Sequence, residues 1–154
     1  MDIAKIIKEN GLLRGLSKNT ISTYISCVDK FLTNYRLAPH QITQNHIKTF
    51  LVRKLESGSA GNTINVYLNA LKFFYEICLN KKLTINIKYS KVPKKLPEFL
   101  TKEECIHFFD CIKNGKHKLM VTLMYSAGLR VSELLNLKVK DFQFEQNYGW
   151  VRQG

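Results

Sequence analysis

Apolar residues recur every three or four positions through the first half of the chain, and this spacing predicts helices. One such row runs through residues 17–35, where Ser17 is placed to cap the first turn. A second row runs through residues 59–80. The positions predicted to be buried in the two rows are Ile21, Ile25, Val28, Leu32, Tyr35, Ile64, Leu68, Leu71, Phe74, Ile77 and Cys78.

Two further helices are expected in the same half of the chain. One covers residues 43–58 and is ended by Gly58, and a short one opens the chain over residues 2–10. Four helices within 82 residues predict a compact bundle. Residues 83–100 then combine lysines with two prolines, which interrupt a helix, so they are expected to form a basic linker.

A second domain is expected to begin at Thr101. Thr101 and Glu104 have the spacing of a capping box, which predicts a helix to about residue 113. The next helix, over residues 116–128, is apolar on nearly all sides and is expected at the centre of a core. A short helix follows, with Glu133 in it and its last residue near Leu137.

Residues 139–151 alternate apolar and polar positions around a turn at 147–149, which predicts a β-hairpin. Three helices and the beginning of a sheet are too little for a closed domain, so residues 101–154 are expected to be the start of a larger one. The predicted fold class is therefore mainly α: a four-helix bundle, a linker, and a truncated, helix-rich segment that ends in a hairpin.

The net charge of the chain indicates what kind of partner it binds. The chain has 24 Lys and Arg against 12 Asp and Glu, a formal charge of +12, and the excess is present in both halves. Such a field attracts polyanions, so nucleic acid is the expected partner. An AT-rich coding sequence, which favours Lys and Asn, is the alternative explanation. The sequence has no signal peptide or membrane-spanning run, so a cytoplasmic location without a membrane partner is expected.

One arginine has a setting that suggests chemistry. Arg130 follows the flexible Gly128 at the start of a helix, and Glu133 lies one turn later, close enough to brace the guanidinium. A braced, desolvated arginine is suited to bidentate binding of a phosphate. A purely structural ion pair is the alternative. Neither the cysteines nor the histidines have the spacing of a metal site, and no metal or cofactor is expected.

A row of asparagines on the helix over residues 59–80 can bind base edges or phosphates as well as water. Solvated surface is the alternative interpretation. The row consists of Asn62, Asn65, Asn69, Lys72 and Glu76.

The stretch AGLRVSELLNLKVKDF, at residues 127–142, resembles the first-arginine motif of the tyrosine recombinases. This is the phage-integrase and Xer-type family of site-specific DNA recombinases. The start of their SAM-like core-binding domain resembles SKNTISTYISCVDKFL, and a later helix resembles SAGNTINVYLNALKFFYE. Their interdomain linker is similar to VPKKLPEFLTKEE, and the strand before their active-site lysine is similar to GWVRQG. The resemblance implies a core-binding domain at 1–82, a linker at 83–100 and an incomplete catalytic domain at 101–154.

The resemblance also implies a mechanism without cofactor. A tyrosine attacks a DNA phosphodiester to form a 3′-phosphotyrosyl bond, and two arginines stabilise charge on the phosphate. Arg130 matches the first arginine and Glu133 the acidic residue that supports it. The lysine is expected just beyond Gly154, and the His-x-x-Arg box and the tyrosine nucleophile have no counterpart in the chain. We therefore expect this chain to bind double-stranded DNA without cleaving it.

The residues expected to contact DNA lie at two helix starts, along the asparagine row and in the linker. They are Lys18, Asn19, Thr20, Asn62, Thr63, Asn65, Asn69, Lys72, Lys91, Lys94 and Lys95. The chain is expected to be a monomer, and the full-length protein a tetramer on paired sites. Two alternatives remain open: a non-enzymatic DNA-binding regulator derived from a shortened recombinase, and a basic helical protein that binds RNA.

Overall fold

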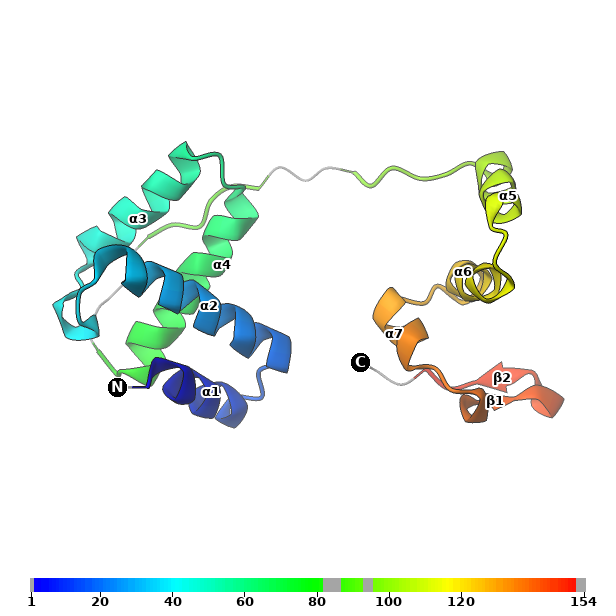
Figure 1. Cartoon of the computed structure of the whole chain (residues 1–154), viewed down its shortest axis with the longest axis horizontal. Coiled ribbons are helices and arrows are strands. Elements are labelled where there is room, and N and C mark those ends of the chain that lie inside the picture. Colours follow the sequence, from blue (N-terminus) through cyan, green and yellow to red (C-terminus); the bar gives the residue numbers. More distant parts are fainter. Residues whose placement is uncertain (1, 82–86, 93–95, 152–154) are drawn as a thin grey trace. The chain divides into compact units, whose positions relative to one another are not determined.

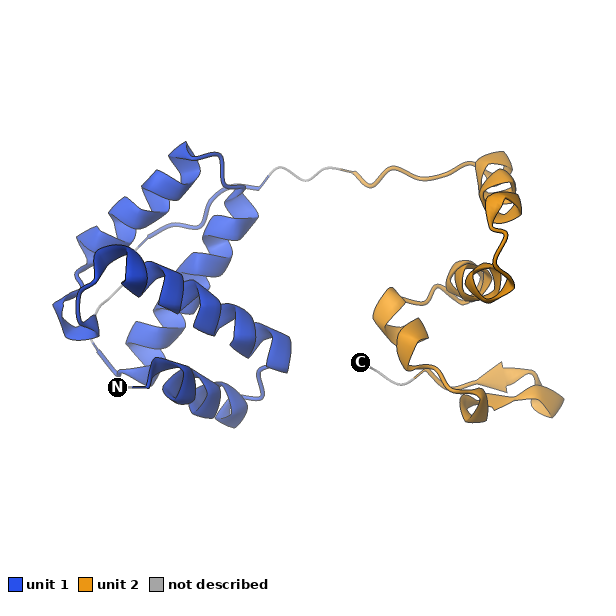
Figure 2. Cartoon of the chain, viewed as in Figure 1, with its two compact units in different colours: residues 1–94 blue, residues 95–154 orange. Residues whose placement is uncertain are grey.

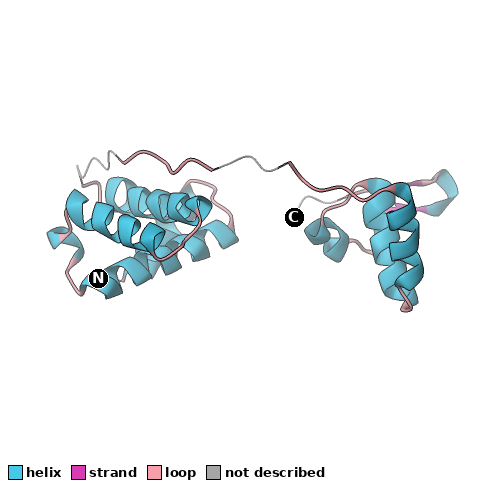
Figure 3. Ribbon diagram, turned by 90° about the horizontal axis from the view of Figure 1, so that it is seen from above, coloured by secondary structure: helices cyan, strands magenta, loops and turns pink. Residues whose placement is uncertain are grey.

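The computed structural model describes residues 2–81, 87–92 and 96–151. The chain divides into two compact units, Met1–Lys94 and Lys95–Gly154 (Figure 2). The described residues form seven α-helices and one antiparallel pair of short strands, so the predicted mainly helical fold is confirmed (Figure 3). None of these helices is long and apolar enough to cross a bilayer.

Unit 1 is the predicted bundle of four helices (Figure 1). α2 packs against α1 and α4, and α3 packs against α4. The last helix is not uniform, because α4 passes into a π-helical turn at Phe73–Cys78. The helices are α1 (Ile3–Leu13), α2 (Lys18–Tyr35), α3 (Gln44–Glu56) and α4 (Gly61–Lys72), with a 3₁₀ turn at Pro39–Gln41 between α2 and α3.

Local side-chain chemistry sets the ends of these helices. The hydroxyl of Ser17 accepts a hydrogen bond from the Thr20 backbone N–H at 3.1 Å, which confirms the predicted cap of α2. The side chain of Asp2 does the same for α1 through the Lys5 N–H at 3.0 Å. Gly58 has φ +85°, a conformation that other residues rarely adopt, and it follows the end of α3 as predicted.

The core of unit 1 is aromatic as well as aliphatic. Phe50 connects two helices, with its ring 5.1 Å from that of Phe31 and 5.5 Å from that of Tyr67. These rings were not among the positions predicted from periodicity. Most predicted positions are buried, whereas four are half-buried and pack against the core: Ile25, Tyr35, Ile77 and Cys78.

Unit 2 begins as the sequence predicts. The Thr101 hydroxyl accepts from the Glu104 N–H at 3.2 Å, and the Glu104 carboxylate accepts from the Thr101 N–H at 2.7 Å, so the capping box is present. The elements that follow are α5 (Lys102–Cys111), α6 (Gly115–Ala127), α7 (Val131–Asn136), β1 (Phe142–Gln143) and β2 (Tyr148–Gly149), with 3₁₀ turns at Val139–Asp141 and Phe144–Gln146.

The prediction that the helix over 116–128 lies at the centre of a core is wrong for the described residues. No side chain of α6 is buried, and Leu119 is 60% exposed. α5 and α7 pack against this helix, for example through the rings of Phe109 and Tyr125 at 5.4 Å. The apolar composition of a helix indicates how much of its surface can be buried. How much is buried depends on which other elements pack against it.

The hairpin is present, but its turn lies earlier than predicted. Asn147 ends the turn with φ 57°, and the strands pair Phe142 with Gly149 and Gln143 with Tyr148. Tyr148 therefore belongs to a strand. Asparagine adopts this left-handed conformation more readily than most residues, which explains the position of the turn.

Two tyrosines of unit 1 give opposite predictions for the same substitution. Tyr75 is fully buried, and its hydroxyl has no hydrogen-bond partner in the described structure. The hydroxyl of Tyr35, in contrast, donates to the backbone oxygen of His46 at 2.8 Å. We expect Tyr75→Phe to raise the free energy of unfolding by about 1 kcal/mol and Tyr35→Phe to lower it by about 1 kcal/mol. Denaturant unfolding of the two variants measures both changes, and changes of the same sign would contradict this account of the core.

Candidate nucleic-acid interface and arginine site

The backbone between α6 and α7 positions Arg130. Gly128 ends α6 with φ 63°, and its N–H donates to the carbonyl of Met124. Arg130 then precedes the first turn of α7. The carboxylate of Glu133 accepts one hydrogen bond from the Arg130 backbone N–H and another from its Nη1, each at 2.8 Å. One carboxylate therefore closes the start of the helix and orients the guanidinium.

The predicted pairing of Arg130 with Glu133 is present, but the predicted desolvation of the arginine is not. The Arg130 side chain is 82% exposed, whereas that of Glu133 is 15% exposed. The backbone N–H of Arg130, its guanidinium hydrogen bond and its charge together hold the pKa of the Glu133 carboxyl below its ordinary value. The guanidinium thus keeps donors open to solvent and remains able to bind an anion.

A groove of about 410 Å³ lies between α2 and α4. Hydroxyl side chains supply most of its polar groups, and Lys30 adds a positive charge. Of the residues predicted to contact DNA, Thr63 lies in this groove. The lining residues are Ser22, Thr23, Ser26, Cys27, Lys30, Thr63, Val66 and Tyr67. Short hydroxyl side chains of this kind can donate and accept hydrogen bonds at phosphates and base edges.

A lysine that the sequence did not single out reaches the same region from α3. The ammonium of Lys54 lies 4.9 Å from the centre of the Tyr67 ring and 5.3 Å from that of Phe50, which are cation–π distances. Burial raises the pKa of the Cys27 thiol, and the charges of Lys30 and Lys54 partly oppose this. The Lys54 ammonium lies over the ring of Tyr67, which lines the groove. In the sequence, the contact of Lys54 with Phe50 could have been inferred from their spacing of four residues, which is one helical turn.

At the start of α2, hydrogen-bonding groups of Ser17 and Thr20 are already used by the helix cap. The hydroxyl of Thr20 lies 2.9 Å from that of Ser17, and its backbone N–H already donates to Ser17. Lys18 and Asn19 are exposed. DNA contacts by Lys18, Asn19 and Thr20 stay a prediction, with the two exposed side chains better placed than the hydroxyl.

The asparagine row on α4 is engaged by the segment 87–92 of the same unit. The Asn65 carboxamide exchanges two hydrogen bonds with the backbone of Ser90, and Asn69 accepts one from the Tyr89 hydroxyl at 2.6 Å. The Lys72 ammonium lies 5.1 Å from the centre of the Tyr89 ring. Asn62, Thr63 and Lys91 are exposed, and Lys94 and Lys95 lie outside the described residues.

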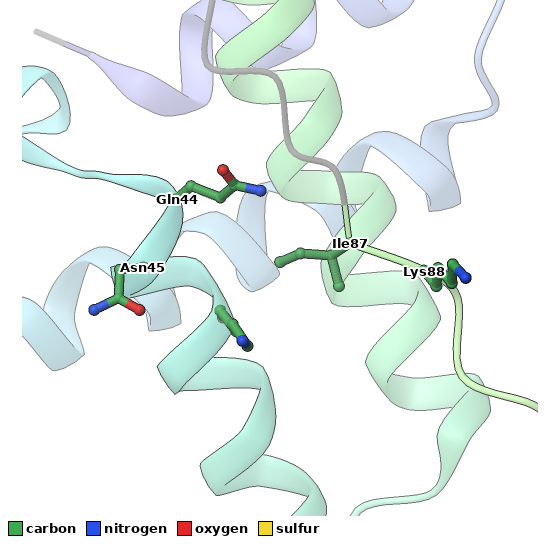
Figure 4. Close-up of a pocket in the computed structure, with 5 residues that line it drawn as sticks. Gln44, Asn45, Ile87 and Lys88 are labelled. Atoms are coloured by element: carbon green, nitrogen blue, oxygen red, sulfur yellow. The ribbon is translucent and has the colours of Figure 1, made fainter.

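A second groove, of about 470 Å³, lies where this segment passes α3 (Figure 4). It is lined by Gln44, Asn45, Lys48, Ile87 and Lys88. In Figure 4, Ile87 lies between α3 and α4. Among the described residues, no three His, Cys, Asp or Glu side chains lie close enough together to hold a metal ion.

Comparison with known proteins gives a consistent result for both units. The family described as "Phage integrase, N-terminal SAM-like domain" matches residues 5–85, and the "Phage integrase family" matches residues 98–154. Tyrosine recombinase XerA of Pyrococcus horikoshii is 35% identical over 142 residues, which are 92% of this chain and 48% of that protein. Tyrosine recombinase XerD of Oceanobacillus iheyensis is 30% identical over 153 residues, with 88% of this chain and 50% of that protein covered.

A solved structure has a similar fold. The crystal structure of XerA recombinase matches with a TM-score of 0.50 at 24% sequence identity, over 99% of this chain and 55% of that chain. The chain thus spans about half the length of the curated relatives that it matches.

The environment of Glu133 predicts how it titrates. Because its folded-state pKa is depressed, its contribution to stability is present above the ordinary pKa of 4.5 and is lost as the pH falls through the folded value. In Arg130→Met the guanidinium is removed but the backbone N–H, the larger cause, remains. We therefore expect the Glu133 pKa to rise part of the way toward 4.5, as measured by ¹³C NMR titration of the carboxyl group. An ordinary pKa for Glu133 in the unmodified chain would contradict the pairing.

Proposed function

Because the chain belongs to the phage integrase family of tyrosine recombinases, we propose that it carries the DNA-binding unit and first catalytic arginine of a site-specific DNA recombinase. The observation that carries the proposal is the exposed Arg130 guanidinium, which donates one hydrogen bond to the Glu133 carboxylate while the Arg130 backbone N–H donates another. This pair lies within residues 98–154, the part that matches the catalytic family. A fixed cation with free donors is suited to a phosphodiester.

The chemistry that this arginine would serve is transesterification at phosphorus. A tyrosine oxygen bonds to the scissile phosphate while the bond to the 5′ oxygen breaks, and the proton ends on the released 5′-hydroxyl. Arg130 would hold the non-bridging oxygens as their negative charge increases in the transition state. Glu133 would keep the guanidinium in place and would not itself touch the phosphate.

Residues 1–154 hold no counterpart of that nucleophilic tyrosine, so this chain by itself is proposed to bind duplex DNA without cleaving it. The ring of Tyr125 on α6 packs against that of Phe109 on α5, and the ring of Tyr148 lies 4.8 Å from that of Trp150. Binding by a monomer is proposed for this chain. Assembly into a tetramer on paired sites is proposed for a protein that also carries the C-terminal half found in the relatives.

For the DNA contact we propose the face of unit 1 that includes the groove between α2 and α4. Its serine and threonine residues are exposed, and positive charge comes from Lys30 on α2 and from Lys54 on α3, which lies over the Tyr67 ring. Residues 1–82 would act as the core-binding domain and 101–154 as the start of the catalytic domain, with residues 83–100 between them. Lys18, Asn19, Asn62 and Thr63 remain candidate contacts on exposed helix starts.

A second candidate is a regulator that occupies the same sites without chemistry. It would bind DNA in the same way, so the coding sequence after codon 154 distinguishes it: a recombinase gene continues with a lysine, a His-x-x-Arg box and a tyrosine. An RNA-binding protein is the third candidate. It would prefer structured RNA over duplex DNA in competition.

Salt dependence of DNA binding tests the proposed face. Each lysine that neutralises a phosphate contributes about 0.9 to the slope of log K against log salt concentration. Lys30→Met and Lys54→Met should each reduce the slope by about 0.9, measured by fluorescence anisotropy with a labelled duplex. Lys5→Met, on the exposed side of α1, is the matched control and should leave the slope unchanged. Equal slopes for all four proteins would rule out the groove as the contact.

The role of Arg130 is tested in the full-length gene product with the nucleophile present. Arg130→Ala should reduce the rate of covalent DNA adduct formation by about 10²-fold or more, because one fixed donor to the transition state is lost. Affinity for duplex DNA should fall by less than about tenfold, since one phosphate contact among many disappears. Adduct formation at the normal rate would show that Arg130 has no catalytic role.

A further inference from the structure

Residues 87–92 lie along α4 and are held there by side chains of the asparagine row. This segment, which we term the strap, lies between the two family matches at 5–85 and 98–154. The two family matches therefore do not describe its position in unit 1. Three residues of α4 that the sequence suggested for DNA, Asn65, Asn69 and Lys72, contact the strap.

The contact is strongest at Asn65, a half-buried residue of α4. Its Nδ2 donates to the Ser90 carbonyl at 3.1 Å, and its Oδ1 accepts from the Ser90 N–H at 2.8 Å. The carboxamide thus satisfies both backbone groups of one residue, as a neighbouring β-strand would. Replacement by aspartate keeps the shape but removes the donor, and it places a carboxylate oxygen against a carbonyl oxygen.

The spacing of the contacts shows that the strap runs antiparallel to α4. Tyr89 lies at Asn69 and Lys72, Ser90 lies at Asn65, and the Lys91 carbonyl and the Val92 side chain lie near Gly61. From Tyr89 to Ser90 the contact on α4 moves by four residues, from Asn69 to Asn65, toward the start of the helix.

Apolar and close contacts at both ends complete the docking. Ile87 packs against the hydrophobic core of unit 1. At the other end, a Cβ atom on Gly61 would lie 3.2 Å from the Ser90 Cβ and 3.3 Å from the Lys91 carbonyl oxygen. A larger residue at Gly61 would therefore push against the strap. Lys88 and Lys91, in contrast, have exposed side chains.

We propose that the polar row of Asn65 and Asn69 on α4 is a docking site for residues 87–92, and that it holds Lys88 and Lys91 at fixed positions to bind the DNA backbone beside α4. The second half of this statement rests on the proposed function, whereas the first half does not. Asn65 is then a positioning residue, which strengthens DNA binding through the strap without touching DNA. Prior ordering of the two lysines removes part of the entropic cost of binding.

The docking is tested without DNA by amide hydrogen exchange of the 154-residue chain, followed by NMR. The Ser90 N–H should be protected, and Asn65→Ala should accelerate its exchange by about tenfold or more, because two hydrogen bonds are lost. Tyr89→Phe removes a single hydroxyl on the strap side and should give a smaller acceleration without disturbing the bundle. Asn62→Ala, an exposed asparagine one turn away, should change nothing. An unprotected Ser90 N–H, or the same exchange in Asn65→Ala as in Asn62→Ala, would overturn the docking.

The positioning role is tested by a double-mutant cycle with a labelled DNA duplex. Asn65→Ala should weaken binding by about threefold or more in the unmodified chain and should have no effect when Lys88 and Lys91 are already alanine. An equal loss in both backgrounds would mean that Asn65 contacts DNA directly, and no loss in either would mean that the strap does not matter for binding; each result overturns the role. A chain that binds no duplex at any salt concentration would refute the proposed function, while the exchange experiment still decides the docking.

Discussion

The packing of α4 against α2 is the constraint on which unit 1 depends. Buried Leu68 and Leu71 pack α4 into the bundle and set the rotation of the helix about its axis. Each of its other faces therefore points in a defined direction. Thr63 then faces the groove beside α2, whereas Asn65 faces the strap. One amphipathic helix therefore supplies a core face, a candidate DNA face and a docking face, and a change in its rotation would disturb all three at once.

In unit 2, the key side chain is positioned by a local electrostatic contact and not by packing between helices. Arg130 is oriented by Glu133 within one helical turn, so its position needs little support from the rest of the unit. This fits a unit in which Leu134 is the one buried apolar side chain among the described residues. A guanidinium that is fixed locally keeps its geometry while the apolar surface of α5 and α6 remains exposed.

Short-range features could be predicted from the sequence, and long-range ones could not. Periodicity predicted several of the buried positions of α2 and α4, and spacing predicted the caps at Ser17 and Thr101 and the pairing of Arg130 with Glu133, because each depends on neighbours within four residues. Asn65 was assigned to DNA because a carboxamide suits base edges and backbone equally well, and its partner lies 25 residues away. The exposure of α6 and the approach of Lys54 to Tyr67 likewise depend on packing between elements.

The central claim, that the α2–α4 face and Arg130 meet DNA, is tested most directly by NMR of the ¹⁵N-labelled chain titrated with a DNA duplex. We predict the largest shifts at the backbone amides of Ser22, Ser26, Thr63 and Val66 and at the Arg130 guanidinium. Shifts confined to α1 and to the apolar surface of α5 and α6, with Arg130 unchanged, would contradict it.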